Sequence, residues 1–212
     1  MTLNEENQPP ASPAESLRLI QEQQAAAARQ LIPDLRAYYL PWGLAWLIGF
    51  GVFFLRYGPD DRVFVDMPAW LPLAVLLALL VTAMVVSGVL SAKAYTQVSG
   101  DSSRRGGWYG SAWFLGFATL AVTLARVSGD LPDDQAGLLW AGATVGLTGA
   151  LHMAGGAIWL DGKLFALGVW ISIINLIGVI AGPGWHALVV SVAGGGGMLL
   201  AGVLAGLARS RR

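Results

Sequence analysis

Apolar and polar positions follow one another along the chain in long blocks. Behind a polar first block lie six apolar stretches, each close to the roughly 20 residues that a helix needs to cross a bilayer core. They occupy residues 38–55, 71–93, 108–125, 135–160, 164–181 and 185–207. The pattern predicts an all-α fold: a polytopic bundle of six transmembrane helices over residues 38–207, followed by a basic cytoplasmic tail at 208–212.

The polar first block, residues 1–37, predicts a cytoplasmic segment that contains one helix over about residues 12–32. Ser12, Pro13 and Glu15 form a helix start, with a capping serine, proline at the first helical position and glutamate three residues after the cap. Pro33 predicts the end. A weak apolar face favours either a solvated helix with a small docking stripe or a helix lying on the membrane or a partner; it comprises Leu17, Ile20, Ala27 and Leu31.

Composition places the chain among membrane proteins. Charged residues make up 12% of it, against about 25% in soluble domains. The formal net charge is zero, so we expect no nucleic-acid partner. No cysteine is present, which excludes disulfides and thiolate metal sites. The first block lacks a basic start and an early apolar core, so no cleaved signal is expected. The abundance of Ala, Gly and Arg favours a bacterial source.

The distribution of basic residues predicts the orientation. With six spans, ten Lys and Arg residues fall on one side, and three, Arg56, Arg62 and Arg126, fall on the other. Cytoplasmic loops are enriched in Lys and Arg. We therefore expect a multi-pass protein of the inner membrane with both termini in the cytoplasm.

A repeated motif predicts an internal duplication. Residues 42–51 and 109–118 share aromatic, glycine and alanine positions, with Trp46 and Trp113 as counterparts. Each motif is followed by a Pro-Asp-Asp loop and then by a tryptophan, Trp70 or Trp140. The pattern favours three hairpins, the first two related by a parallel repeat. Chance recurrence of Trp, Gly and Ala in apolar helices is the alternative.

Small residues at four-residue spacing predict where helices approach closely, because lipid gives helices no hydrophobic reason to associate. The fourth span supplies Gly142 and Gly146, and the sixth supplies Gly197 and Ala201. These two helices are the expected centre of the bundle. The run of four glycines at 194–197 indicates a kink, an unwound segment or a tight helix crossing.

Few polar residues lie inside the spans. His152 is the one titratable group well inside a span, and counting from the turn near residue 161 predicts that Thr148, Ser172 and Asn175 lie near it. Two interpretations stay open: local satisfaction of each polar group, or a patch that lines a cavity or binds a ligand.

Motifs for catalysis, metals and cofactors are missing from the sequence. His152 and His186 are too far apart in depth to hold one haem, and Ser111 lacks the Gly-x-Ser-Gly frame of rhomboid proteases. There is no phosphate-binding glycine loop and no zinc motif. We expect a protein that is not an enzyme and that has no cofactor and no metal.

Residues 12–20 and 39–51 resemble small actinobacterial integral membrane proteins, a group labelled uncharacterised or transporter-like. A cytoplasmic helix before six spans is also similar to the permease half of type-2 ABC exporters, which implies a separate ATPase. A transport-related or permease-like role is therefore expected. The alternative is a membrane sensor or accessory subunit that contacts a cytoplasmic regulator. Either role fits a homo-oligomer in the lipid bilayer.

Overall fold

The chain divides into two compact units, Met1–Asp34 and Leu35–Arg212. The computed structural model describes residues 12–31, 35–95 and 100–210. In these ranges the backbone is helical, with short turns, one 3-10 segment and one π-helical segment, and it contains no strand. The predicted all-α class is therefore confirmed.

The first unit holds α1, Pro13–Leu31, which corresponds to the helix predicted over residues 12–32. Ser12 Oγ accepts a hydrogen bond of 3.2 Å from the backbone N–H of Glu15. This bond satisfies one of the amide groups that a helix leaves unpaired at its start. Leu17 and Ile20 are exposed. Residues 1–11 lie outside the described residues, as do 211–212 of the predicted basic tail.

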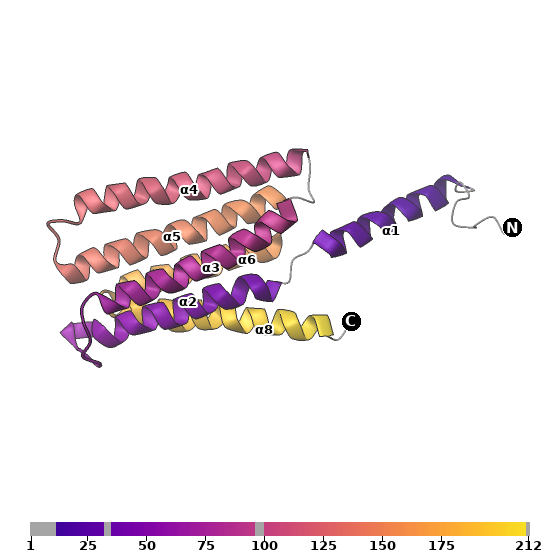
Figure 1. Cartoon of the computed structure of the whole chain (residues 1–212). Helices are drawn as coiled ribbons and strands as arrows, with labels where there is room; N and C mark the ends of the chain where they lie inside the picture. Colours follow the sequence, from indigo (N-terminus) through magenta and orange to yellow (C-terminus); the bar gives the residue numbers. More distant parts are fainter. Residues whose placement is uncertain (1–11, 32–34, 96–99, 211–212) are drawn as a thin grey trace. The chain divides into compact units, whose positions relative to one another are not determined.

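The second unit is a bundle of long helices that run back and forth along one direction (Figure 1). Its last three segments follow one another without a break in helical backbone. In chain order the helices are α2 (Leu35–Arg56), α3 (Leu71–Tyr95), α4 (Asp101–Val127), α5 (Asp133–Trp159), α6 (Gly162–Ala181), α7 (Trp185–Val189), the π-helical η3 (Val190–Gly195) and α8 (Gly196–Ser210).

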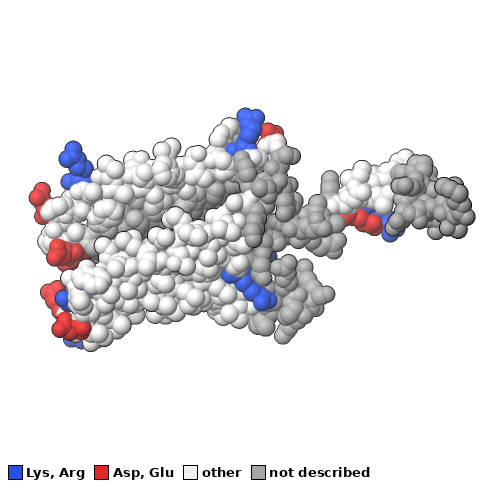
Figure 2. Space-filling view, in the orientation of Figure 1, with Lys and Arg blue, Asp and Glu red and all other residues white. Residues whose placement is uncertain are grey.

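Five helices of the described chain are long and apolar enough to cross a membrane. They are α2, α3, α4, α6 and the combined α7–η3–α8. On the face seen in Figure 2, charged side chains of this unit lie at its two ends, and the long sides are almost free of charge. The chain is thus a multi-pass membrane protein by the length and composition of its helices.

The helix at the position of the predicted fourth span, α5, is not among these five. It has 27 residues, which gives it the length of a membrane span. It also contains several glycines and threonines and His152, which are less apolar than the Leu, Ile and Val that dominate α3 and α6. Length and composition alone therefore leave α5 undecided.

Neighbours along the chain form the most extensive helix pairs. These are α5 with α6, and α2 with α3. The last helix, α7–η3–α8, packs along α2 and also contacts α6. By contrast, α4 packs on α5 less extensively. The first and last parts of the unit therefore close on each other, while α4 lies at one side of the bundle (Figure 1).

The hydrophobic core lies where α2, α6 and α7–η3–α8 meet. Trp46 and Phe50 of α2 pack edge to face, with ring centroids 5.9 Å apart. The sequence-based expectation placed the fourth and sixth spans at the centre, but the neighbours of the last helix in the core are chiefly α2 and α6. The buried hydrophobic residues are Ala45, Trp46, Phe50, Ala83, Leu124, Val145, Ile171, Ile174, Val190 and Met198.

The two Pro-Asp-Asp loops of the predicted repeat adopt different structures. Pro59–Asp61 forms the 3-10 segment η2, in which Asp60 and Asp61 have positive φ angles of 56° and 57°. Pro132 instead directly precedes α5 as its N-cap residue. The first loop also lies against the turn after α6, because a Cβ on Gly184 would meet the backbone of Pro59.

Candidate functional site

A polar pair, one side chain half-buried and the other buried, joins α6 to α7 near one end of the bundle. The side-chain Oδ1 of Asn175 lies 2.9 Å from Nε2 of His186. The Nδ2 of Asn175 donates a second hydrogen bond, also 2.9 Å long, to the backbone carbonyl of Gly142 in α5. His186 is buried, with 2% of its surface exposed. We call Asn175, His186 and the Gly142 carbonyl the polar triad.

The hydrogen bonds of the polar triad fix the tautomer of His186. Because Nδ2 of Asn175 donates to a carbonyl, the oxygen Oδ1 faces the imidazole, and an amide oxygen can only accept. Nε2 of His186 therefore carries the proton, and Nδ1 of the neutral ring is an acceptor. The triad links three helices through groups that would be costly to bury without partners.

Glycines make room for the polar triad. A Cβ on Gly178 would lie 2.8 Å from Cδ2 of His186, so the imidazole lies directly on the α6 backbone. A Cβ on Gly146 would lie 3.2 Å from Nδ2 of Asn175. Residues with side chains at either position would push the polar groups apart. The small residues here position hydrogen-bonding groups as well as helices.

The π-helical segment η3 begins four residues after His186. Its Ser191 Oγ donates a 2.7 Å hydrogen bond to the backbone carbonyl of Leu47 in α2. Trp170 of α6 donates from Nε1 to the carbonyl of Ala193 at 3.2 Å. Short π-helical segments within longer helices frequently occur at functional sites. Here the segment carries hydrogen bonds to the helices on both sides of it.

The polar patch predicted around His152 is not a single cluster. Thr148 Oγ1 donates to the carbonyl of Thr144 at 2.8 Å, and Ser172 Oγ donates to that of Gly168 at 2.9 Å. His152 Nδ1 lies 2.8 Å from the carbonyl of Thr148, so Nδ1 carries the proton. Each of these three side chains thus forms a hydrogen bond to a backbone carbonyl of its own helix.

His152 meets an aromatic ring where the prediction placed polar neighbours. Its imidazole lies edge to face with the indole of Trp113 in α4, with ring centroids 5.3 Å apart. Asn175, the fourth member of the predicted patch, is held by the polar triad instead. The interpretation of local satisfaction therefore describes the geometry of Thr148, Ser172 and His152.

Sequence reasoning missed that His186 pairs with Asn175. A signal was present, because Gly178 and His186 lie equally far from Gly182, where α6 ends. Asn175 precedes Gly178 by about one turn, on the same face of α6. Counting from Gly182 would therefore have placed His186 at the level of Gly178, about one turn from Asn175.

The predicted packing residues contact neighbours to different degrees. A Cβ on Gly142 would lie 2.9 Å from Cγ2 of Val179, and one on Gly197 would lie 3.0 Å from Nε1 of Trp170. Gly195, inside the predicted glycine run, is tighter: a Cβ there would lie 2.6 Å from the Cα of Leu47. Ala201 is half-buried. The glycine run thus forms a π-helical segment and a tight crossing together.

Metal ligands do not gather in the described part of the chain, where no group of three or more His, Asp or Glu side chains could hold an ion. No protein-family model, curated protein or solved structure matches the chain. The chemistry available at the polar triad is hydrogen bonding between helices. Its function has to be inferred from that geometry.

Proposed function

We propose that the chain is a six-span membrane protein with both termini in the cytoplasm, in which α5 crosses the bilayer together with the five more apolar helices. This proposal is supported by the length of α5 and by its extensive packing on α6, which is itself apolar enough to span. A helix packed along a span over most of its length shares the same membrane depth. The excess of Lys and Arg on one side supports the orientation.

The cysteine-free sequence allows a direct test of this topology. Single cysteines at Asp130 and Lys163 flank α5 on its two ends. In intact cells, a membrane-impermeant maleimide should label Asp130→Cys, whereas Lys163→Cys should react only after permeabilisation. Labelling of both from outside would place α5 on one side of the membrane. The reverse pattern would invert the orientation.

The function that the geometry supports best is that of a non-transporting membrane protein, an accessory or sensor subunit that contacts a cytoplasmic regulator. The observation that carries this proposal is the filled interior between α2, α6 and α7–η3–α8. Trp46, Phe50 and Ile174 pack there, and both hydrogen bonds of the polar triad join one helix to another. A bundle with tightly packed helices and hydrogen bonds between them is suited to a rigid, non-transporting role.

The cytoplasmic helix supplies the surface for such a contact. In α1, Leu17 and Ile20 lie three residues apart on one helical face, and both are exposed. Arg18 and Glu22 form an exposed ion pair of 2.8 Å, which raises the pKa of the Arg18 guanidinium. Apolar residues at helical spacing beside charged ones are typical of a helix that docks in a groove of a partner.

A crosslinking experiment tests this role. Photo-crosslinkers at Leu17 and, as a control on the opposite face of α1, at Glu22 would be introduced into the full chain in its native membrane. A soluble protein crosslinked from Leu17, and lost when Ile20 is changed to Glu, would support the accessory role. Equal crosslinking from both positions, or crosslinking to lipid alone, would contradict it.

Permease-like transport is the second candidate, and it is favoured by the π-helical segment beside the polar triad. Broken or widened helices and polar groups at helix crossings are features of transporter sites. In this case the triad would have to open during a transport cycle. Locking it with a disulfide between Asn175→Cys and His186→Cys should then abolish function in cells. A locked chain that keeps its cellular function would exclude this candidate.

A further inference from the structure

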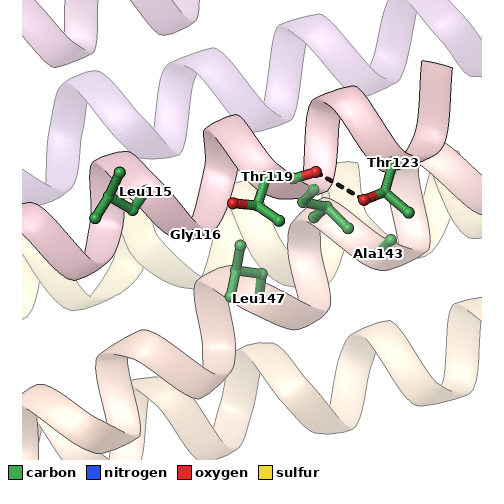
Figure 3. A pocket seen from close by; sticks show the side chains of 7 residues that line it. Leu115, Gly116, Thr119, Thr123, Ala143 and Leu147 are labelled. Atoms are coloured by element: carbon green, nitrogen blue, oxygen red, sulfur yellow. Dashed lines mark hydrogen bonds between the residues drawn. The ribbon is translucent and has the colours of Figure 1, made fainter. Parts of the chain in front are cut away.

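Beside the contact between α4 and α5 runs an open apolar groove with a volume of about 530 Å³ (Figure 3). Leu115, Thr119 and Thr123 border it on α4, and Ala143 and Leu147 border it on α5. The Oγ1 of Thr123 donates to the carbonyl of Thr119 at 2.9 Å, so this hydroxyl is already satisfied. The surface of the groove is therefore mainly aliphatic over slightly more than two turns of α4.

The groove leads to a cationic side chain at one end of α4. Leu115, Thr119 and Thr123 repeat every four residues, and Arg126 follows three residues later on the same face. From Leu115 to Arg126 the helix rises about 16 Å, close to half of a bilayer core about 30 Å thick. The distance from the inner end of the groove to Arg126 therefore matches the thickness of one lipid leaflet.

The charges around Arg126 select the headgroup. Arg126 is exposed, and within the described residues neither recorded ion pair involves it. Asp130, Asp133 and Asp134 follow at the same end, in the turn before α5 and in its first helical turn. The hydrogen bond from Trp140 Nε1 to Ser128 Oγ, 3.1 Å, ties this turn to α5. Arg126 complements the phosphate of a zwitterionic headgroup, and the carboxylates complement its ammonium. Because the carboxylates outnumber the cation, this end of the helix pair repels a lipid with a net negative charge.

We propose that the groove between α4 and α5 binds one acyl chain of a phospholipid with an ethanolamine headgroup. The phosphate is bound by Arg126, and the primary ammonium is bound by the carboxylates at the start of α5. The same shared chemistry occurs in choline lipids, but a quaternary ammonium has no N–H to donate to a carboxylate. This inference rests on the proposed membrane crossing of α5.

Native mass spectrometry tests the proposal with the full chain extracted from nanodiscs of equal parts phosphatidylethanolamine, phosphatidylcholine and phosphatidylglycerol. We expect phosphatidylethanolamine to be retained in preference to both others. Arg126→Gln should lower its retention roughly two- to fivefold, the range for loss of one exposed charge contact. Arg104→Gln, at the opposite end of the same helix, is the matched control and should retain the lipid. Equal retention of the three lipids, or a preference for phosphatidylglycerol, would overturn the headgroup assignment.

Filling the groove tests the acyl-chain site separately. Ala143→Leu places a larger side chain in the groove and should reduce retention of the lipid. Ala121→Leu, on an exposed part of α4 outside the groove, should not. If Ala143→Leu retained as much phosphatidylethanolamine as the unchanged chain, the retained lipid would be bound non-specifically around the protein. That result would overturn the site.

A cysteine in the groove separates the remaining outcomes. In the proposed arrangement, Thr119→Cys should resist a membrane-impermeant maleimide and should form no disulfide with a second chain. Efficient crosslinking between two chains would show that a second copy fills the groove, which overturns the lipid assignment. Labelling by the maleimide would place the groove in water and would refute the lipid site, whereas the crossing of α5 is tested separately by the cysteines at Asp130 and Lys163.

Discussion

The two copies of the duplicated motif form the same kind of helix and lie in different surroundings. In α2, Trp46 and Phe50 are buried in the core, and Phe50 lies edge to face with His186, 6.4 Å between ring centroids. In α4, the counterparts Trp113 and Phe117 stack 5.7 Å apart and are half-buried. The motif therefore specifies an aromatic row on a helix, and the neighbours of the helix decide how deeply that row is buried.

Glycines at equivalent positions show the same difference. A Cβ on Gly43 of α2 would lie 2.9 Å from Leu199, whereas Gly110, its counterpart in α4, has nothing within 4 Å. A Cβ on Gly49 would lie 2.5 Å from Leu76, and one on its counterpart Gly116 would lie 3.6 Å from Leu147. The last helix, α7–η3–α8, packs closely against α2. Among the described residues, no helix packs as closely against α4.

Replacing the paired tryptophans should give the largest difference between the copies. Trp46→Ala removes a side chain that is 4% exposed and leaves a cavity in the core; we expect it to cost about 3–5 kcal/mol. Trp113→Ala removes a half-buried ring and should cost less than about half of that. The free energy of unfolding in mixed micelles, measured from the loss of helical circular dichroism, checks both. Equal losses would show that the copies are equally buried.

The crossing of η3 on α2 should be the next most sensitive feature. Gly195→Ala places a Cβ against the backbone of Leu47, where a shift is required, and we expect a loss of about 1–3 kcal/mol. The neighbouring Gly196→Ala is the control: a Cβ there has nothing within 4 Å, and alanine favours helix over glycine by about 1 kcal/mol. Thermal unfolding in detergent should separate the two variants. A stabilising Gly195→Ala would remove the argument for tight closure of the first copy.

Block hydropathy was sufficient to predict the helices, because crossing a bilayer requires uninterrupted apolar length. It could not predict the π-helical segment, since that depends on how Gly194 and Gly195 meet α2. It also placed His152 among polar neighbours, because depth counting fixes the level of a residue and leaves its direction around the helix open. The meeting of His186 and Asn175 was encoded by the spacing around Gly182, but it requires knowledge of which faces of α6 and α7 pack together.

The surroundings of His186 and His152 predict a third, smaller difference, in how strongly each histidine is coupled to a neighbouring side chain. Asn175→Leu leaves His186 buried without its acceptor, and we expect a cost of about 1–2 kcal/mol. A double-mutant cycle with His186→Leu should show coupling between the two residues. The cycle of His152→Leu with Thr148→Ala should show almost none, because the Thr148 carbonyl that His152 binds belongs to the backbone. Unfolding in mixed micelles provides the four free energies of each cycle, and absence of coupling between Asn175 and His186 would contradict the triad.

The hydrogen bonds of the first aromatic residue in each copy of the motif, Trp42 and Tyr109, should give the smallest difference in stability between the copies. Trp42 donates from Nε1 to Ser87 Oγ at 2.8 Å, and its counterpart Tyr109 donates to the carbonyl of Leu151 at 2.6 Å. Ser87→Ala leaves an indole N–H without its acceptor, and we expect a loss of about 1 kcal/mol. Tyr109→Phe removes the donor itself and leaves a carbonyl inside a helix, which can still accept from its own backbone; the expected loss is about 0.6 kcal/mol or less. Unfolding of both variants under the same conditions compares them, and a larger loss for Tyr109→Phe would mean that α4 depends on this one bond more than α2 depends on its own.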